Sequence, residues 1–123
     1  MIPQKLLDCL KDEGVVSIVT QGVESPHVVN TWNSYLIITN DSCILIPVGG
    51  MNLTEENLHR NGNVLMTLGS RNVEGFRYKG TGFLIKGSAV MKDSGFEFDT
   101  IREKFHWVRK VLVVKTNQIE QTL

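Results

Sequence analysis

Two segments of the chain carry the side chains and backbone groups best suited to binding a small molecule. The first, residues 30–35, reads Asn-Thr-Trp-Asn-Ser-Tyr and sets two large aromatic rings among amide and hydroxyl groups. The second, residues 48–51, reads Val-Gly-Gly-Met and leads into a helix start near Thr54. Aromatic rings pack against planar ligands, glycine lets backbone approach closely, and the N-terminus of a helix binds anions. Together these features suit a flat aromatic ligand that carries a phosphate.

Each of these residues also has an ordinary structural interpretation, and the sequence leaves both open. Gly49-Gly50 can be a turn that needs positive φ, and Thr54 can cap a helix with no ligand present. Trp32 and Tyr35 can pack in the core or in an interface. Because these two rings are three residues apart in an expected strand, we expect them on opposite faces. Trp107 has polar neighbours, and we expect it at the edge of the same pocket.

The expected phosphate site offers hydroxyl and amide groups rather than positive charge. We expect Thr54 and the free N–H groups of the following helix to bind the anion, with Asn57 one turn further on. No lysine or arginine lies between Gly49 and Asn57. Arg71, which follows Ser70 at the end of a neighbouring strand, is therefore the nearest cation that the sequence suggests.

Composition and spacing argue against several other classes of protein. Acidic and basic residues balance at 13 each, so we expect neither nucleic acid nor an anionic membrane as a partner. No apolar run is long enough to cross a membrane, and a signal peptide is not expected. His27, His59 and His106 are dispersed, so we expect no metal site, and we find no catalytic acid or base. Cys9 and Cys43 are expected as free thiols of a cytoplasmic protein, with one disulfide as the alternative.

The length of 123 residues, 41% of them hydrophobic, suits one domain that spans residues 1–123. Hydrophobic alternation and turn residues predict strands at residues 15–20, 27–39, 44–48, 63–71, 81–91 and 108–117, and helices at residues 3–13, 53–60 and 97–107. Asn52 and Glu55 fit a capping box for the second helix. Because hairpins join most of the strands, the pattern predicts a mainly β protein, a closed antiparallel barrel with short helices at its corners.

Six segments carry a resemblance to a known family: residues 13–16, 29–36, 47–51, 65–71, 80–85 and 120–123. On these segments the chain resembles the small FMN-binding proteins of the flavin split-barrel superfamily, known from sulfate-reducing bacteria and related to pyridoxamine phosphate oxidase. The resemblance implies a six-stranded antiparallel split barrel with short flanking helices. It also implies a homodimer that binds one FMN per subunit near the dimer interface.

The resemblance further implies roles for individual residues. Residues 30–32 would line the flavin, residues 48–50 would present backbone to its ring, and Leu123 would reach the flavin of the partner subunit. Members of the family commonly place a lysine beside the phosphate-binding threonine, where this chain has Leu53; Arg71 is expected to compensate. The expected cofactor-binding residues are Asn30, Thr31, Trp32, Tyr35, Val48, Gly49, Gly50, Met51, Thr54, Asn57, Ser70, Arg71, Trp107 and Leu123.

Two functions remain open at this stage. The first is a non-covalent FMN flavoprotein that performs electron transfer or flavin reduction, with a redox partner protein or NAD(P)H as the other reactant. The second is a split-barrel module that holds flavin, haem or a deazaflavin without turnover. Pyridoxamine phosphate oxidation is a third and weaker hypothesis, because the sequence shows no arginine-rich cluster that could bind the phosphate of the substrate.

Overall fold

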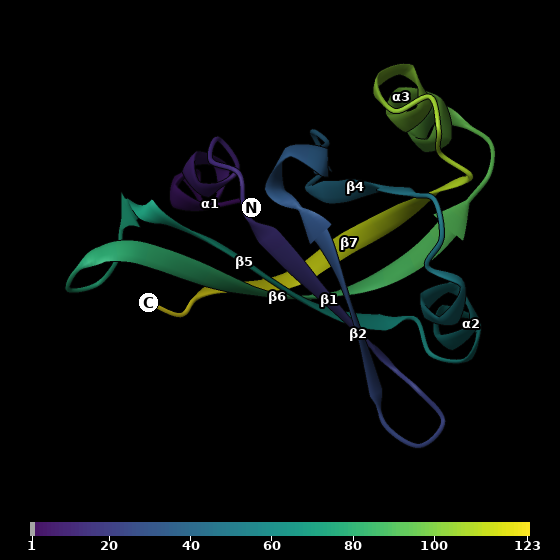
Figure 1. Cartoon of the computed structure of the whole chain (residues 1–123), viewed down its shortest axis with the longest axis horizontal. Coiled ribbons are helices and arrows are strands. Elements are labelled where there is room, and N and C mark those ends of the chain that lie inside the picture. The colour runs from purple at the N-terminus through teal and green to yellow at the C-terminus, as the bar shows by residue number, and fades with distance from the viewer. Residues whose placement is uncertain (1) are drawn as a thin grey trace.

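Alternating hydrophobic and polar residues fold the chain into one strongly curved antiparallel sheet with short helices around it (Figure 1). The structure is a computed structural model that describes residues 2–123. The seven strands lie in the order β2-β1-β5-β6-β7-β4-β3. The strands are β1 (Val15–Gln21), β2 (Pro26–Trp32), β3 (Ile37–Ile38), β4 (Cys43–Val48), β5 (Asn63–Glu74), β6 (Lys79–Lys92) and β7 (Lys110–Gln121). The helices are α1 (Gln4–Cys9), α2 (Asn52–Arg60), α3 (Phe96–Lys104) and the 3-10 helix η1 (Asn33–Tyr35).

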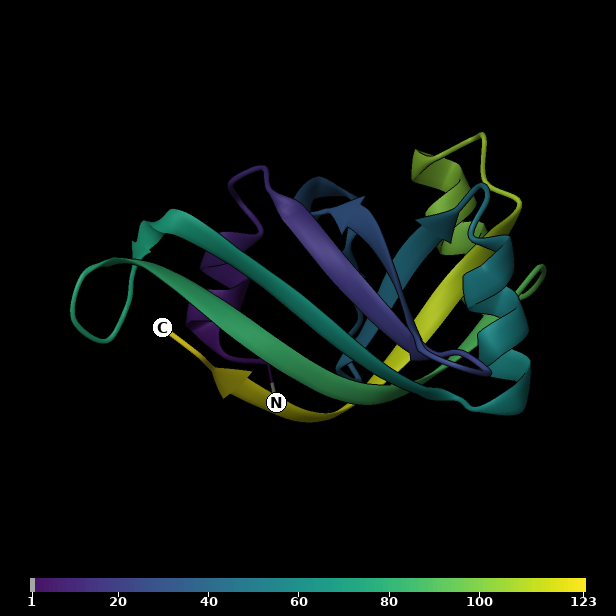
Figure 2. The same ribbon diagram turned by 60° about the horizontal axis from the view of Figure 1, so that its bottom comes forward.

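The core lies inside the curve of the sheet. In β5, Val64, Met66 and Leu68 point inward, while Leu65 between them is exposed. This two-residue period repeats in β1, where Val16 and Ile18 are buried. Figure 2 shows α1 packed near one end of the sheet and α2 near the other. The result is the mainly β, barrel-like architecture that the sequence predicts.

The predicted strand at residues 27–39 is broken in two, which accounts for the seventh strand. Asn33 is buried, and its Nδ2 donates to the carbonyl oxygens of Cys9 (3.3 Å), Asp12 (2.9 Å) and Gly69 (3.2 Å). These bonds hold the backbone in η1, so that β2 ends at Trp32 and β3 restarts at Ile37. η1 thereby joins the two edge strands of the sheet and closes the curve.

Further boundaries differ from the prediction, among them the end of α1 at Cys9 and the end of β7 at Gln121. The predicted loop at residues 72–80 is largely strand, because β5 and β6 continue to a tight turn in which the Gly75 N–H donates to the Tyr78 carbonyl (2.8 Å). Helix α3 ends at Lys104 rather than at residue 107. Cys9 and Cys43 are free thiols, as predicted. None of the helices in the described part of the chain is long and apolar enough to span a membrane.

Candidate cofactor-binding site

Helix α2 begins without a side-chain cap. Its N-cap residue is Met51, which has a left-handed backbone (φ 56°), and no side chain bonds to the first turn. The first helical bond runs from the Glu55 N–H to the Met51 carbonyl (3.0 Å). Within residues 2–123, the N–H groups of residues 52–54 donate to no protein acceptor. The predicted capping box is therefore wrong: Asn52 is the first helical residue, and Glu55 binds basic side chains instead.

Thr54 lies inside the first turn of α2 rather than at its cap. The side chain is fully buried, and its hydroxyl has no hydrogen-bond partner among the described residues. An unpaired buried hydroxyl costs about 1–3 kcal/mol, so it marks a position where a partner is missing. Free N–H groups and an unpaired hydroxyl in one helical turn are the donor set that suits a phosphate.

The Gly49-Gly50 bend connects β4 to this helix, and both glycines are exposed. A Cβ atom on Gly49 would lie 3.3 Å from the Cζ3 atom of Trp107, so the indole already occupies that space. A Cβ atom on Gly50 would meet nothing within 4 Å. The bend therefore exposes backbone without side chains next to the indole of Trp107. The sequence predicts that such backbone contacts the ring of a planar ligand.

An aromatic cluster connects the bend to the end of β2. The ring centroids of Tyr35 and Trp107 are 5.8 Å apart, and Phe105 lies 5.1 Å from Tyr35 and 5.9 Å from Trp107. Tyr35 lies in η1, so the expectation that it shares a strand with Trp32 is wrong. Trp32 ends β2 with 44% of its surface exposed. Tyr35, Phe105 and Trp107, from two distant parts of the chain, thus form one aromatic wall beside Gly49.

The β2 residues alternate between the inside and the outside of the sheet. Thr31 is buried, whereas Asn30 and Trp32 are exposed. The Asn30 Oδ1 atom accepts a hydrogen bond from Ser17 (3.4 Å). Thr31 therefore lies on the core side of β2, and its two neighbours lie on the outer face.

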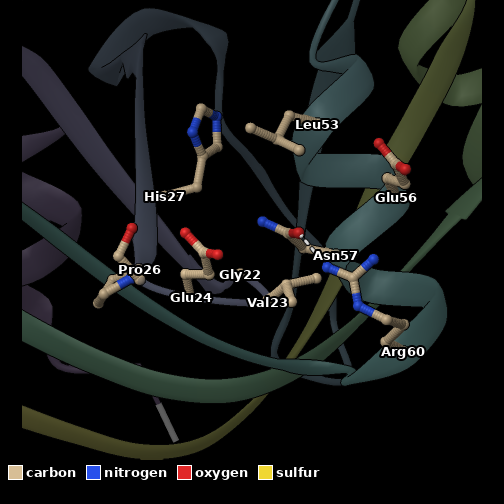
Figure 3. A pocket seen from close by; sticks show the side chains of 10 residues that line it. Gly22, Val23, Glu24, Pro26, His27, Leu53, Glu56, Asn57 and Arg60 are labelled. Atoms are coloured by element: carbon tan, nitrogen blue, oxygen red, sulfur yellow. Dashed lines mark hydrogen bonds between the residues drawn. The ribbon is translucent and has the colours of Figure 1, made fainter.

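Both the nitrogen and the oxygen of the Asn57 amide are hydrogen-bonded within the protein. Its Nδ2 donates to the Thr20 hydroxyl (3.1 Å), and its Oδ1 accepts from Arg60 Nη2 (2.7 Å). Figure 3 shows the Arg60 bond at a cavity of about 360 Å³ between α2 and the β1–β2 turn. Leu53 and His27 also line this cavity. These bonds tie α2 to β1 and to Arg60 in its own last turn.

His27 and Arg60 are basic side chains that line this cavity beside α2, and neither was among the expected binding residues. Arg60 follows Leu53 and Asn57 at helical spacing, which was the available signal. His27 could not be found in this way, because only the β1–β2 hairpin brings it opposite the helix.

Ser70, Arg71 and Leu123 lie together, but away from α2. They line a second cavity, of about 610 Å³, near the end of β5. The Ser70 hydroxyl donates to Asp12 Oδ2 (2.7 Å), and the Leu123 carbonyl accepts from Thr81 Oγ1 (2.8 Å). Within one chain, the structure therefore does not bring Arg71 to the start of α2.

Glu55 in α2 and Glu13 at the Ser70 cavity both have a lowered pKa. Lys110 Nζ (2.5 Å) and Arg109 Nη1 (2.9 Å) bind Glu55, and these bonds hold the pKa of Glu55 below its ordinary value. Hydrogen bonds from the Ser34 hydroxyl (2.6 Å) and N–H (3.1 Å) likewise lower the pKa of Glu13. Both groups are therefore held as carboxylates.

The chain has a close relative among known proteins. It is 52% identical over 123 residues, the full length of both chains, to an FMN-binding protein of Nitratidesulfovibrio vulgaris. The chain belongs to the family of this FMN-binding protein. The predicted resemblance is thereby confirmed. No protein-family model matches the chain.

Solved structures support the fold of this FMN-binding protein family. HupZ of Group A Streptococcus superposes with a TM-score of 0.81, over 98% of this chain and 94% of that chain, at 14% identity. An FMN-binding protein of Syntrophomonas wolfei superposes with a TM-score of 0.74, over 98% of this chain and 85% of that chain, at 16% identity. The predicted split barrel is confirmed, apart from the additional short strand β3.

We expect replacement of Glu55 to change how stability depends on acid. Because the pKa of Glu55 is lowered in the folded chain, its contribution is present above the ordinary carboxyl pKa and is lost as pH falls through the folded-state value. The free energy of unfolding should therefore fall less steeply in this acid range for Glu55→Gln than for the unmodified chain. Urea unfolding at a series of pH values measures this, with the exposed Glu103→Gln as control. Parallel curves for Glu55→Gln and the unmodified chain would contradict it.

Proposed function

We propose that this chain binds FMN non-covalently and acts in electron transfer or flavin reduction. The first support is the 52% identity to an FMN-binding protein over the whole chain. The second is the uncapped first turn of α2, where an unpaired, buried Thr54 hydroxyl lies among free N–H groups. The identity indicates the ligand, and the donor set fits its phosphate.

The residues divide naturally between the two ends of this cofactor. The N–H groups of residues 52–54 and the hydroxyl of Thr54 would hold the phosphate. The bare backbone of Gly49-Gly50 and the ring of Trp107 would face the flavin. Bound FMN supplies the redox chemistry, and the protein supplies position, electrostatics and shielding from water.

The charged groups at the bend favour electron transfer over acid–base catalysis. Glu55, Arg109 and Lys110 form one ion-paired network, with Glu55 contacting both basic side chains. The bonds from Lys110 and Arg109 hold the pKa of Glu55 below its ordinary value, so this carboxylate is not poised to take a proton from a substrate. A redox partner protein or NAD(P)H is the counterpart that such a site would need.

We also propose that the chain forms a homodimer through the outer face of its sheet. The exposed hydrophobic residues Val15, Val28, Trp32 and Leu65 lie there. Val15 pairs with Trp32 across β1 and β2, and Val19 pairs with both Val28 and Leu65. These residues therefore form two apolar groups on one face of the sheet, with the polar pair Ser17 and Asn30 between them. Exposed apolar groups gathered on one face are typical of a protein interface.

The C-terminal residues lie on the same outer face, where they could contact the partner subunit. Gly69 pairs with Gly82 in the middle of the sheet, and the Thr122 N–H donates to the Gly82 carbonyl (2.8 Å). Leu123 follows β7 and lies beside Gly82, whereas Trp32 lies at the end of the edge strand β2. A two-fold axis near the glycine pair would bring the partner's Leu123 toward Trp32. The cavity at Ser70 and Arg71 would then open toward the partner's flavin.

The visible spectrum of the purified chain tests FMN binding directly. We expect flavin absorbance in the protein, or its appearance when cofactor-free protein is titrated with FMN. Reduction of bound FMN by NAD(P)H, followed by electron transfer to a cytochrome, would support redox function. Bound FMN that no such donor reduces would favour a module without turnover. A chain that gains no flavin absorbance would end the proposal.

Replacing Thr54 with valine should weaken FMN binding. The change removes one hydroxyl donor while keeping the shape of the side chain, so we expect a loss of about 1 kcal/mol in binding free energy. Fluorescence titration with FMN measures the dissociation constant, with Thr100→Val in α3 as control. Unchanged affinity of Thr54→Val would place the phosphate elsewhere.

Replacing Leu53 with lysine should strengthen FMN binding. Leu53 is partly exposed in the first turn of α2, and a lysine there adds a charge-assisted contact to the phosphate. We expect affinity to rise about tenfold, as for a contact worth about 1.5 kcal/mol, and the gain to shrink with added salt. Leu53→Gln, which adds no charge, is the matched control. A lysine variant no tighter than the glutamine variant would refute this placement of the phosphate.

A further inference from the structure

Arg109 binds three successive carbonyl groups of the bend between β4 and α2. Its backbone N–H donates to the Val48 carbonyl (2.8 Å), its Nε to the Gly49 carbonyl (3.0 Å) and its Nη2 to the Gly50 carbonyl (2.7 Å). Its remaining nitrogen, Nη1, lies 2.9 Å from Glu55 Oε1 in the first turn of α2. One residue therefore fixes the orientation of three consecutive peptide groups and ties them to the helix.

The fixed carbonyls determine where the N–H groups of the bend point. In a trans peptide, the carbonyl of one residue and the N–H of the next point in opposite directions, and no described peptide bond is cis. The N–H groups of Gly49, Gly50 and Met51 are therefore directed away from Arg109. None of them donates to an acceptor within residues 2–123. They continue without a break into the free N–H groups of residues 52–54.

The guanidinium of Arg109 makes its contacts to this bend with backbone. Its Nε and Nη2 donate to carbonyls of the bend, and its Nη1 faces Glu55, a carboxylate that it shares with Lys110. Arg109 also holds the peptides leading into Met51, whose left-handed backbone is unfavourable for a residue with a side chain. Its contacts therefore maintain a shape that the bend would not keep alone.

We propose that Arg109 is a positioning residue that turns the N–H groups of Gly49, Gly50 and Met51 toward the acceptor atoms of the flavin ring. The inference rests on the proposed function and adds a residue that touches the backbone rather than the cofactor. N–H donors bind an electron-rich acceptor more strongly than a neutral one. The arrangement therefore favours the reduced form of the cofactor over the oxidised form, and Arg109 contributes to its reduction potential.

The test compares Arg109→Gln, Arg109→Lys and the control Arg102→Gln, which changes an exposed arginine on α3. Fluorescence titration gives the dissociation constant for oxidised FMN, and dithionite titration against a reference dye gives the midpoint potential. For Arg109→Gln we expect affinity about tenfold weaker and a more negative potential. Arg109→Lys cannot replace the Nε and Nη2 bonds together, so we expect a smaller shift in the same direction. Arg102→Gln should match the unmodified chain.

The outcomes separate this inference from the proposed function. If the unmodified chain binds FMN and Arg109→Gln keeps the same affinity and potential, the positioning role is overturned while FMN binding stands. If Arg109→Gln does not fold, Arg109→Lys decides, and a potential equal to that of the unmodified chain overturns the role. Failure of the unmodified chain to bind FMN would overturn both.

Discussion

Free backbone N–H groups between Gly49 and Thr54 are the feature on which the candidate site depends. A strand normally ends in a turn that satisfies its own groups, and a helix normally begins with a capping side chain. Here neither occurs within the described residues. Donors left unpaired in this way are costly when buried and useful when a ligand supplies the acceptors. The Thr54 hydroxyl is buried and unpaired in the same turn, so it also lacks a hydrogen-bond acceptor that a ligand could supply.

Contacts from other parts of the fold position the bend between β4 and α2. Antiparallel pairing of β4 with β7 aligns Val48 with Lys110, and this register places Arg109 beside the bend. The break at η1 turns Tyr35 toward Trp107, so that the aromatic wall comes from two distant parts of the chain. Asn57, bonded to Thr20 and Arg60, holds α2 against the β1–β2 hairpin. Apart from the local bond between Asn57 and Arg60, these contacts join residues that are far apart in the sequence.

The sequence predicted the parts of this site that depend on local chemistry. Paired glycines, a helix start and an indole with polar neighbours are visible in any single sequence. In the structure Gly49 lies beside Trp107, and Thr54 lies in the first turn of α2. The sequence did not reveal Arg109, which is 60 residues from Gly49 and meets it only through strand register. It misplaced the cap at Asn52, because the partners of Glu55 are equally distant. It assigned Arg71 to the phosphate on the basis of strand order, whereas in one chain this arginine lines another cavity.

The most direct test of the account is the NMR spectrum of the backbone amides of residues 49–54, recorded on 15N-labelled protein without and with FMN. We predict that these amide protons exchange rapidly with water in the cofactor-free protein. On addition of FMN they should move downfield and become protected from exchange, while amides on α3 remain unchanged. Tight binding of FMN that leaves these amides at their original positions and exchange rates would contradict the account.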